Sequence, residues 1–356
     1  MPVKVENKKL GSSGLSVSPI IVGCMSFGKK SWGDWVIEDE EEVFKILKKC
    51  YDNGLRTFDT ADVYSNGHSE VILGKFLKKY DIPREKVVIL TKLYGTIDTR
   101  IPDFKNVVTE SQYPSFEFAN SKGLSRKHIF DAIQGSVERL GTYVDVIQIH
   151  RLDKSTPKVE IMKALNDVVL AGHARYIGSS STKAVDFVAL QHIADKNGWF
   201  KFISMQNYYN LLYREEEREM IPFCQSNELG EVGLIPWSPL ASGILARPVG
   251  GSSTSNRTLP PAALKMYFGL SQDSKADNEI ISRVEELAKK HDVSMAVIAT
   301  AWSISKGTIP ILGLNSVSRV DDALKSLTVT LTDEEISYLE EPYEPKGVLQ
   351  QLAEHN

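Results

Sequence analysis

Short apolar or β-branched runs alternate along this chain with longer segments that carry the helical period of about 3.6 residues. The runs predicted as strands are 20–22, 57–59, 87–91, 144–149, 176–178, 202–205, 233–236 and 309–312. The clearest amphipathic patterns, predicted as helices, are 40–52, 70–79, 126–140, 158–171 and 184–196. A helix between two strands joins them in parallel through a right-handed crossover. The alternation therefore predicts an α/β protein that closes into a (β/α)₈ TIM barrel.

A doubly wound open sheet is the competing architecture. Its dinucleotide fingerprint G-x-G-x-x-G does not occur in the chain, and neither does the phosphate loop G-x-x-x-x-G-K-[ST]. Pro236 and Pro310 weaken two strand assignments because proline cannot donate a hydrogen bond to a ladder, yet both lie in strongly apolar runs. We expect residues 1–356 to form one barrel domain.

Two connections, 93–125 and 241–276, are too long for ordinary links between a strand and a helix. Five aromatic residues in the first suggest a lid over a site, and they are Tyr94, Phe104, Tyr113, Phe116 and Phe118. The acidic run 215–219 is predicted to be the solvated start of a helix, where negative charge favours the helix dipole.

Charge and composition exclude several classes of function. The net charge is −4, and Lys and Arg are scattered, so we expect no nucleic-acid or membrane partner. Cys24, Cys50 and Cys224 form no C-x-x-C pair, which argues against disulfides and a cysteine zinc site. No signal-type apolar segment stands at the start of the sequence, so we expect a cytoplasmic protein. The seven His show no paired-ligand spacing, which disfavours a metal-dependent hydrolase.

Polar and aromatic residues follow several of the predicted strands, namely Asp59, Lys92, His150, Gln206 and Trp237, with Tyr64 in the loop after Asp59. In a barrel the carboxyl ends of the strands meet at one rim, where active sites form. A Tyr beside a Lys that is paired with an Asp is a plausible acid, because the ammonium favours the phenolate and lowers the pKa of the phenol. His150 could donate a hydrogen bond to the same substrate oxygen.

These residues lie in motifs that resemble those of the aldo-keto reductases. Residues 58–70, FDTADVYSNGHSE, are similar to the family signature F-D-T-A-x-x-Y-x-x-G-x-S-E, and 148–153, QIHRLD, are similar to Q-x-H-x-x-D. The likeness continues from an N-terminal hairpin at 10–18 through Thr91-Lys92 and WSPL at 237–240 to 313–323. It is strongest toward the fungal branch of aryl-alcohol dehydrogenases and versiconal hemiacetal acetate reductase.

The resemblance implies an NADPH-dependent reductase that converts aldehydes or ketones, aromatic or bulky aldehydes above all, to alcohols by hydride transfer without a metal. By this resemblance the catalytic residues are Asp59, Tyr64, Lys92 and His150. Tyr64 would protonate the carbonyl oxygen, Lys92 would lower the pKa of Tyr64, and Asp59 would hold Lys92. His150 would orient the carbonyl. Together with Tyr64 and His150, the expected substrate contacts are Trp32, Trp35 and Tyr94.

The resemblance also implies a set of cofactor contacts: Gly23, Met25, Asp59, Ser180, Ser181, Gln206, Trp237, Ser238, Leu240, Ser242, Gly243, Arg257, Gly313, Asn315, Arg319 and Asp322. Trp237 would stack on the nicotinamide, and Gln206 with the serines after 178 would hold its carboxamide. Residues 238–243 and Arg257 would surround the pyrophosphate. Arg319 would meet the 2′-phosphate, which favours NADPH over NADH. Ser181 and Ala323 each stand where the family often has Asn.

A protein that binds the cofactor mainly as a sensor is the alternative. Potassium-channel β-subunits resemble the same family and keep the four catalytic residues, so the motifs alone leave this alternative open.

Overall fold

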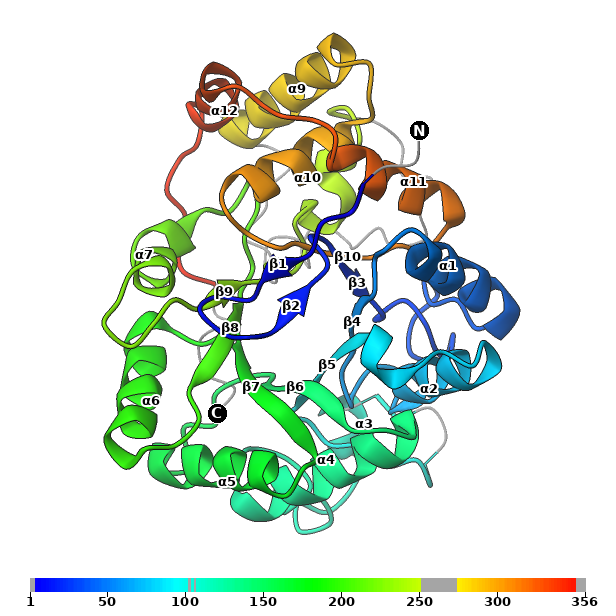
Figure 1. Cartoon of the computed structure of the whole chain (residues 1–356), viewed down its shortest axis with the longest axis vertical. Helices are drawn as coiled ribbons and strands as arrows, with labels where there is room; N and C mark the ends of the chain where they lie inside the picture. Colours follow the sequence, from blue (N-terminus) through cyan, green and yellow to red (C-terminus); the bar gives the residue numbers. More distant parts are fainter. Residues whose placement is uncertain (1–3, 102–103, 106, 251–273, 350–356) are drawn as a thin grey trace.

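A parallel, eight-stranded sheet forms the centre of the computed structural model, which describes residues 4–101, 104–105, 107–250 and 274–349. The strands are β3 (Ile21–Gly23), β4 (Thr57–Asp59), β5 (Val88–Leu93), β6 (Val144–Ile149), β7 (Ala174–Ser180), β8 (Phe202–Gln206), β9 (Gly233–Leu234) and β10 (Ile311–Leu312). Their order in the sheet is β10-β3-β4-β5-β6-β7-β8-β9, so each strand neighbours the next in sequence and the sheet curls round (Figure 1). The predicted (β/α)₈ barrel is confirmed.

Backbone hydrogen bonds close the sheet between its two outermost strands. The Ile309 amide donates to the Leu234 carbonyl at 2.9 Å, and the Ile311 amide donates to the Pro236 carbonyl at 3.0 Å. The Pro310 carbonyl accepts from Ile21 at 3.0 Å. Both prolines thus take part in pairing through their carbonyls alone, and β9 and β10 stay short because a proline supplies no N–H.

Helices surround the sheet (Figure 1). Those of the barrel units are α1 (Glu40–Asp52), α2 (His68–Lys79), α4 (Arg126–Leu140), α5 (Lys158–Leu170), α6 (Ala184–Asn197), α7 (Met220–Gln225), α10 (Met295–Ser305) and α11 (Val317–Ser326). Further helices are α3 (Val107–Glu110), α9 (Lys275–Lys290) and α12 (Asp333–Glu340). The five predicted helices are confirmed with small shifts at their ends. Side-chain caps explain several starts: Asp39 accepts from two amides of α1, and Ser125 accepts from His128 in α4.

An N-terminal hairpin covers one end of the barrel and lies in front of the strands in Figure 1. It consists of β1 (Lys8–Lys9) and β2 (Ser16–Val17), paired antiparallel. Its buried Leu10 and Val17 join a cluster with Ile21 and other side chains of the barrel interior. Gly11 has φ +58°, and a Cβ there would lie 2.4 Å from the Glu231 carbonyl oxygen, so the turn requires glycine. Since this end is plugged, any barrel site must open at the carboxyl ends of the strands.

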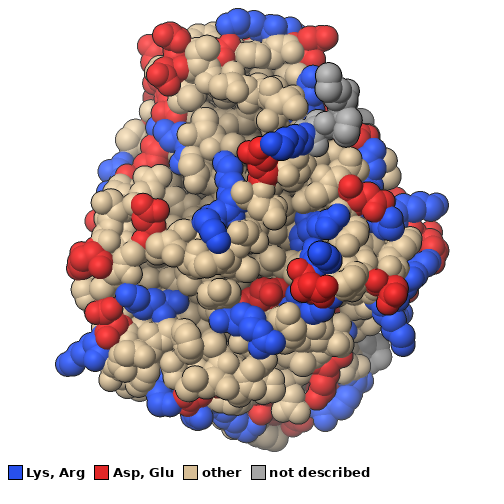
Figure 2. All heavy atoms as spheres, in the orientation of Figure 1, with Lys and Arg blue, Asp and Glu red and all other residues tan. Residues whose placement is uncertain are grey.

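The face seen in Figure 1 carries intermixed Lys, Arg, Asp and Glu rather than a patch of one sign (Figure 2). Within the described residues, no helix is long and apolar enough to cross a bilayer.

The structure describes most of the first long connection, 93–125, but only the two ends of the second, 241–276. In the first, Phe104 and Phe118 are buried, with ring centroids 5.6 Å apart, and Tyr113 packs on Phe118 at 5.5 Å. These rings anchor the loop on itself, whereas Phe116 is 75% exposed. The second connection contains the 3₁₀ segment η3 (Ala241–Ala246) and the beginning of α9, while 251–273 lie outside the described residues.

The prediction that the acidic run at 215–219 is solvated is wrong for its first residues. Glu215 and Glu216 are buried in the 3₁₀ segment η2 (Glu215–Glu217). Glu216 accepts a hydrogen bond from Asn207 at 2.5 Å, and Glu215 accepts from the Tyr343 hydroxyl at 2.6 Å. Burial raises the pKa of Glu216 to about 7. The C-terminal segment that supplies Tyr343 covers the run, which no local pattern could indicate.

A buried ion pair joins α2 to α4. The Glu70 carboxylate is fully buried and accepts from Arg139 Nε at 2.7 Å and from the Thr91 hydroxyl at 2.5 Å. Removal of one partner from such a pair leaves an uncompensated buried charge.

We therefore expect Arg139→Met to lower the free energy of unfolding by about 3–5 kcal/mol. The matched control is Arg126→Met, since Arg126 pairs with Asp167 but is half exposed. The control should lose less than about 1 kcal/mol. Urea denaturation of the three proteins measures both values, and equal losses would contradict a structural role for the Glu70–Arg139 pair.

Candidate active site

The four predicted catalytic residues meet at the carboxyl end of the barrel. Asp59 is the last residue of β4, Lys92 lies near the end of β5, and His150 directly follows β6. Lys92 Nζ donates to Asp59 Oδ2 at 2.5 Å and to the Tyr64 hydroxyl at 3.2 Å. The Tyr64 and His150 rings are edge-to-face, with centroids 6.0 Å apart. The lysine thus links the carboxylate to the phenol, as the sequence motifs suggested.

Asp59 is held from its other side by two amides. Its Oδ1 accepts from Gln148 Nε2 and from Gln206 Nε2, both at 3.0 Å, and Gln206 Nε2 also lies 3.0 Å from Gln148 Oε1. Asp59, Gln148 and Gln206 come from β4, β6 and β8, alternate strands whose inward side chains form one layer of a barrel. The layer fixes the carboxylate beneath Lys92.

A tight turn aims Tyr64 into the site. Ser65, Asn66 and Gly67 follow it with φ of 50°, 52° and 86°, a left-handed run that turns the chain into α2. The Asn66 side-chain amide donates to the Asp98 carbonyl at 2.8 Å, which fixes the turn to the connection after β5. The Tyr64 position therefore depends on backbone geometry at the turn as well as on Lys92.

Burial sets the protonation of these groups. Burial raises the pKa of Tyr64 above its usual value, and Lys92 opposes this only in part. The predicted effect of Lys92 has the right sign, but the prediction of a net lowering is wrong because burial outweighs it. For Lys92, burial pushes the pKa down, while Asp59 and Tyr64 together push it up and prevail. Burial, with the charges of Arg151 and Lys92, holds the pKa of His150 well below its usual value.

At neutral pH the site accordingly presents a neutral phenol, a charged lysine and a neutral imidazole. A neutral phenol has a proton to donate, and a neutral imidazole still carries one N–H. These are the groups that a proton donor and a carbonyl-orienting residue need.

Aromatic residues cover one side of Tyr64. Trp32 lies 5.8 Å from Tyr64 between ring centroids, and Trp35 lies 5.4 Å from Trp32. Met25 packs in the same small cluster. Tyr94 begins the connection after β5 and is half-buried, and its carbonyl accepts from Gly123 at 2.8 Å. Trp32 therefore meets Tyr64 directly, whereas Trp35 packs behind Trp32.

On the other side of the site, Trp237 presents a half-buried ring. It packs on Tyr208 with centroids 4.7 Å apart, and its Nε1 donates to the Ser181 hydroxyl at 3.3 Å. Ser180 Oγ and the Ser181 amide both donate to the Gln206 carbonyl. These contacts join the ends of β7, β8 and β9 into one support for the indole.

The chain after Trp237 is an irregular backbone with repeated left-handed residues. Ser238, Ala241, Ser242 and Gly243 have φ of 51°, 47°, 56° and 88°. Such turns direct successive amides into a concave cradle that suits anions. The buried Ser242 hydroxyl has no hydrogen-bond partner among the described residues, so it remains available to a ligand.

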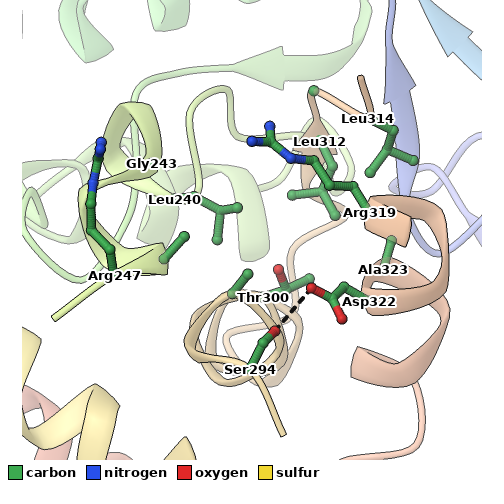
Figure 3. Close-up of a pocket in the computed structure, with 13 residues that line it drawn as sticks. Leu240, Gly243, Arg247, Ser294, Thr300, Leu312, Leu314, Arg319, Asp322 and Ala323 are labelled. Carbon is green, nitrogen blue, oxygen red and sulfur yellow. Dashed lines mark hydrogen bonds between the residues drawn. The ribbon is translucent and has the colours of Figure 1, made fainter. Parts of the chain in front are cut away.

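Beside this cradle lies a cavity of about 250 Å³ between η3, α10 and α11, shown in Figure 3. Its lining includes five predicted cofactor residues, which are Leu240, Gly243, Gly313, Arg319 and Asp322. Asp322 accepts from the Ser294 hydroxyl at 3.0 Å. Arg319 lies in the first turn of α11, where Ser316 caps the helix. The cradle and the cavity form one continuous region suited to a phosphate-bearing cofactor.

Arg247 is a functional candidate that the sequence reasoning missed. It lines the same cavity, and Figure 3 shows it across the opening from Arg319. Burial and the charge of Arg319 lower the pKa of Arg247, as expected for two cations facing one space. The sequence feature that could have indicated Arg247 is the presence of a basic residue soon after the WSPL segment at 237–240.

Gly23 and Asn315 are predicted cofactor residues that do not line this cavity. Gly23 ends β3, where a Cβ would lie 3.1 Å from the Leu312 carbonyl oxygen, and Asn315 follows β10. Arg257 lies outside the described residues. Among the described residues no group of three His, Cys, Asp or Glu is arranged to hold a metal ion.

Comparison with known proteins is consistent with this site. Residues 19–344 match the sequence profile of the aldo/keto reductase family. A putative aryl-alcohol dehydrogenase of Saccharomyces cerevisiae is 54% identical over 344 residues, which cover 97% of this chain and 98% of that protein. Versiconal hemiacetal acetate reductase of Aspergillus parasiticus is 53% identical over 345 residues, covering 97% and 98%. An aldo-keto reductase of Alternaria alternata is 44% identical over 353 residues, covering 96% and 93%.

The Lys92–Asp59 pair gives a test of the electrostatics. Asp59→Asn removes the charge that offsets the burial of Lys92, so we expect the free energy of unfolding to fall by about 3–5 kcal/mol near pH 7. Without Asp59, burial lowers the pKa of Lys92 below its unfolded value. The difference in the free energy of unfolding between the variant and the wild type, called the deficit here, should therefore shrink as the pH rises toward about 10. Urea denaturation at both pH values measures the deficit.

The double variant Asp59→Asn, Lys92→Met supplies the control. It removes both charges and should recover much of the lost stability. A deficit that is independent of pH and persists in the double variant would show that Asp59 acts through its hydrogen bonds to Gln148 and Gln206 alone.

Proposed function

The chain belongs to the aldo/keto reductase family, and on this basis we propose that it reduces aldehydes and ketones, aromatic or bulky aldehydes above all, to alcohols with NADPH. The observation that carries the proposal is the position of Lys92 Nζ between Asp59 Oδ2 and the Tyr64 hydroxyl. That arrangement supplies a buried phenol with a fixed cation beside it, at the open end of the barrel.

In reduction, Tyr64 donates its proton to the carbonyl oxygen as negative charge develops there. Lys92 stabilises the phenolate that results, because its ammonium lies 3.2 Å from the Tyr64 oxygen. Asp59 keeps Lys92 charged and in place. His150, neutral, donates a hydrogen bond that orients the carbonyl. A nicotinamide cofactor, when bound, would supply the hydride.

Trp237 would provide the flat surface for the nicotinamide ring. Its packing on Tyr208 and its hydrogen bond to Ser181 support that role by fixing the indole plane. Ser180 at the end of β7 and Ser181 after it, with Gln206, would meet the carboxamide. The left-handed run 238–243 would hold the pyrophosphate through its amides.

NADPH is proposed over NADH because two arginines face the cavity beside that cradle. No described carboxylate forms an ion pair with Arg247 or Arg319, so both can bind the 2′-phosphate. Ser294, which donates to Asp322, contributes a polar edge to the same cavity.

An aromatic substrate is favoured by Trp32, which packs against Tyr64 and can flank a ring bound at the phenol. The relative named a putative aryl-alcohol dehydrogenase points toward the same class.

Replacement of the proton donor tests the chemistry. We expect Tyr64→Phe to lower turnover of benzaldehyde by about 10²–10⁴-fold, because the phenol proton is lost while the ring and its packing remain. NADPH binding, followed by quenching of Trp fluorescence, should stay near the wild-type value. An equal loss of binding and turnover would show a structural role for Tyr64. If wild type binds NADPH but reduces no carbonyl, the cofactor-sensing alternative becomes the better account.

Cofactor choice can be tested separately. We expect Arg319→Gln or Arg247→Gln to weaken NADPH binding by about 10- to 100-fold, the effect of losing one charge-assisted contact to phosphate. NADH binding should change little. Lys325→Gln is the control, since Lys325 is exposed on the same helix outside the cavity lining. Equal weakening of both cofactors, measured by fluorescence titration, would contradict a specific role in 2′-phosphate recognition.

A further inference from the structure

Arg151 stands beside the catalytic groups without a countercharge. It directly follows His150, and its Nη1 donates to the His150 carbonyl at 2.7 Å. The side chain is half-buried at the carboxyl end of the barrel. No described carboxylate lies within ion-pair distance of it. By contrast, the half-buried arginines Arg84, Arg139 and Arg214 each pair with an Asp or Glu.

Arg151 lies close enough to the candidate site for its charge to act there. It acts on Tyr64 and on His150, the two residues proposed to contact the carbonyl oxygen. Burial lowers the pKa of the Arg151 guanidinium, and Tyr64 and Tyr94 are the groups that oppose this. Arginine nevertheless remains protonated in proteins. The site therefore contains a permanent, partly desolvated cation flanked by phenols.

A desolvated cation is unfavourable unless an anion accompanies it. Within the described part of the chain its side chain makes one hydrogen bond, from Nη1 to the His150 carbonyl, so the planar fork can still bind two oxygens at once. Trp32 and Tyr64 supply an aromatic wall nearby. An aryl ring with an acidic substituent would satisfy both features, since the ring meets the wall and the acid meets the guanidinium.

We propose that Arg151 is a specificity-determining residue that binds a carboxylate on the carbonyl substrate, so that the enzyme prefers aryl aldehydes that carry an acid group. The inference rests on the proposed function, because it assumes that the carbonyl is bound at Tyr64. It adds a substrate class, acidic aryl carbonyl compounds, and a residue that recognises it.

The test compares acids with their uncharged counterparts. The 2-, 3- and 4-carboxybenzaldehydes and their methyl esters are offered with NADPH, and the ratio of kcat/KM for acid over ester is measured for each isomer. We expect the acid to be preferred for at least one isomer. Arg151→Gln should lower that ratio by about 10- to 100-fold, as expected for one charge-assisted fork.

Two further variants sharpen the result. Arg151→Lys keeps the charge but loses the fork, so it should retain part of the preference. Arg175→Gln removes the same charge from the start of β7, at the opposite end of the barrel, and should leave the ratio unchanged. Thermal unfolding and NADPH binding verify that each variant is folded.

A second readout needs no turnover. In a calorimetric titration, benzoate should bind the NADP⁺-loaded wild type more tightly than it binds the NADP⁺-loaded Arg151→Gln variant.

The outcomes separate the two proposals. Reduction of the esters with no preference for any acid, or a ratio unchanged in Arg151→Gln, would overturn the role of Arg151 and leave the reductase function standing. An equal loss of kcat/KM for acid and ester would also overturn it, and would show that Arg151 acts through Tyr64 or His150 instead. If no aldehyde is reduced, the reductase proposal fails, and the benzoate titration still decides whether Arg151 binds a carboxylate.

Discussion

The buried ion pair between Lys92 and Asp59 is the interaction on which the site depends. A lysine almost without solvent contact keeps its charge only if a carboxylate is fixed beside it. Asp59 is fixed because Gln148 and Gln206 donate to its other oxygen from two further strands. The closed sheet brings these strands into one layer, so the barrel itself, closed by two short strands that prolines flank, maintains the charge that acts on Tyr64.

The two ends of the barrel contrast in regularity. The hairpin end is filled by apolar side chains, and left-handed glycines serve its close turn at Gly11 and several turns that lead into the strands, such as those at Gly54, Gly141 and Gly172. At the other end, non-glycine residues adopt left-handed conformations after β4 and after β9, at Ser65–Asn66 and again in the run from Ser238. Such conformations are unfavourable for residues with a Cβ and persist where surrounding contacts enforce them. Here they direct a phenol and a set of backbone amides toward the open end.

Two groups of arginines show a similar contrast. Arg84, Arg139 and Arg214 pair with carboxylates and hold the framework together. Arg151, Arg247 and Arg319 pair with no described carboxylate, and they lie beside the catalytic groups or around the cavity. At these three positions an unpaired cation can bind an anion from outside, and the proposed cofactor and the proposed acidic substrate would supply such anions.

The sequence by itself determined the barrel, because the spacing of apolar residues in strands and helices is a local property. It also determined the residue types of the site, because Asp59, Lys92 and His150 stand at strand ends that a barrel must bring together. Only the tertiary structure decided how those groups are charged. Burial of Tyr64 reverses the expected net shift of its pKa, and distant Tyr343 covers Glu215, since desolvation depends on every element packed around a group. The position of Arg247 opposite Arg319 likewise follows from the irregular turn after Trp237, which no periodic pattern encodes.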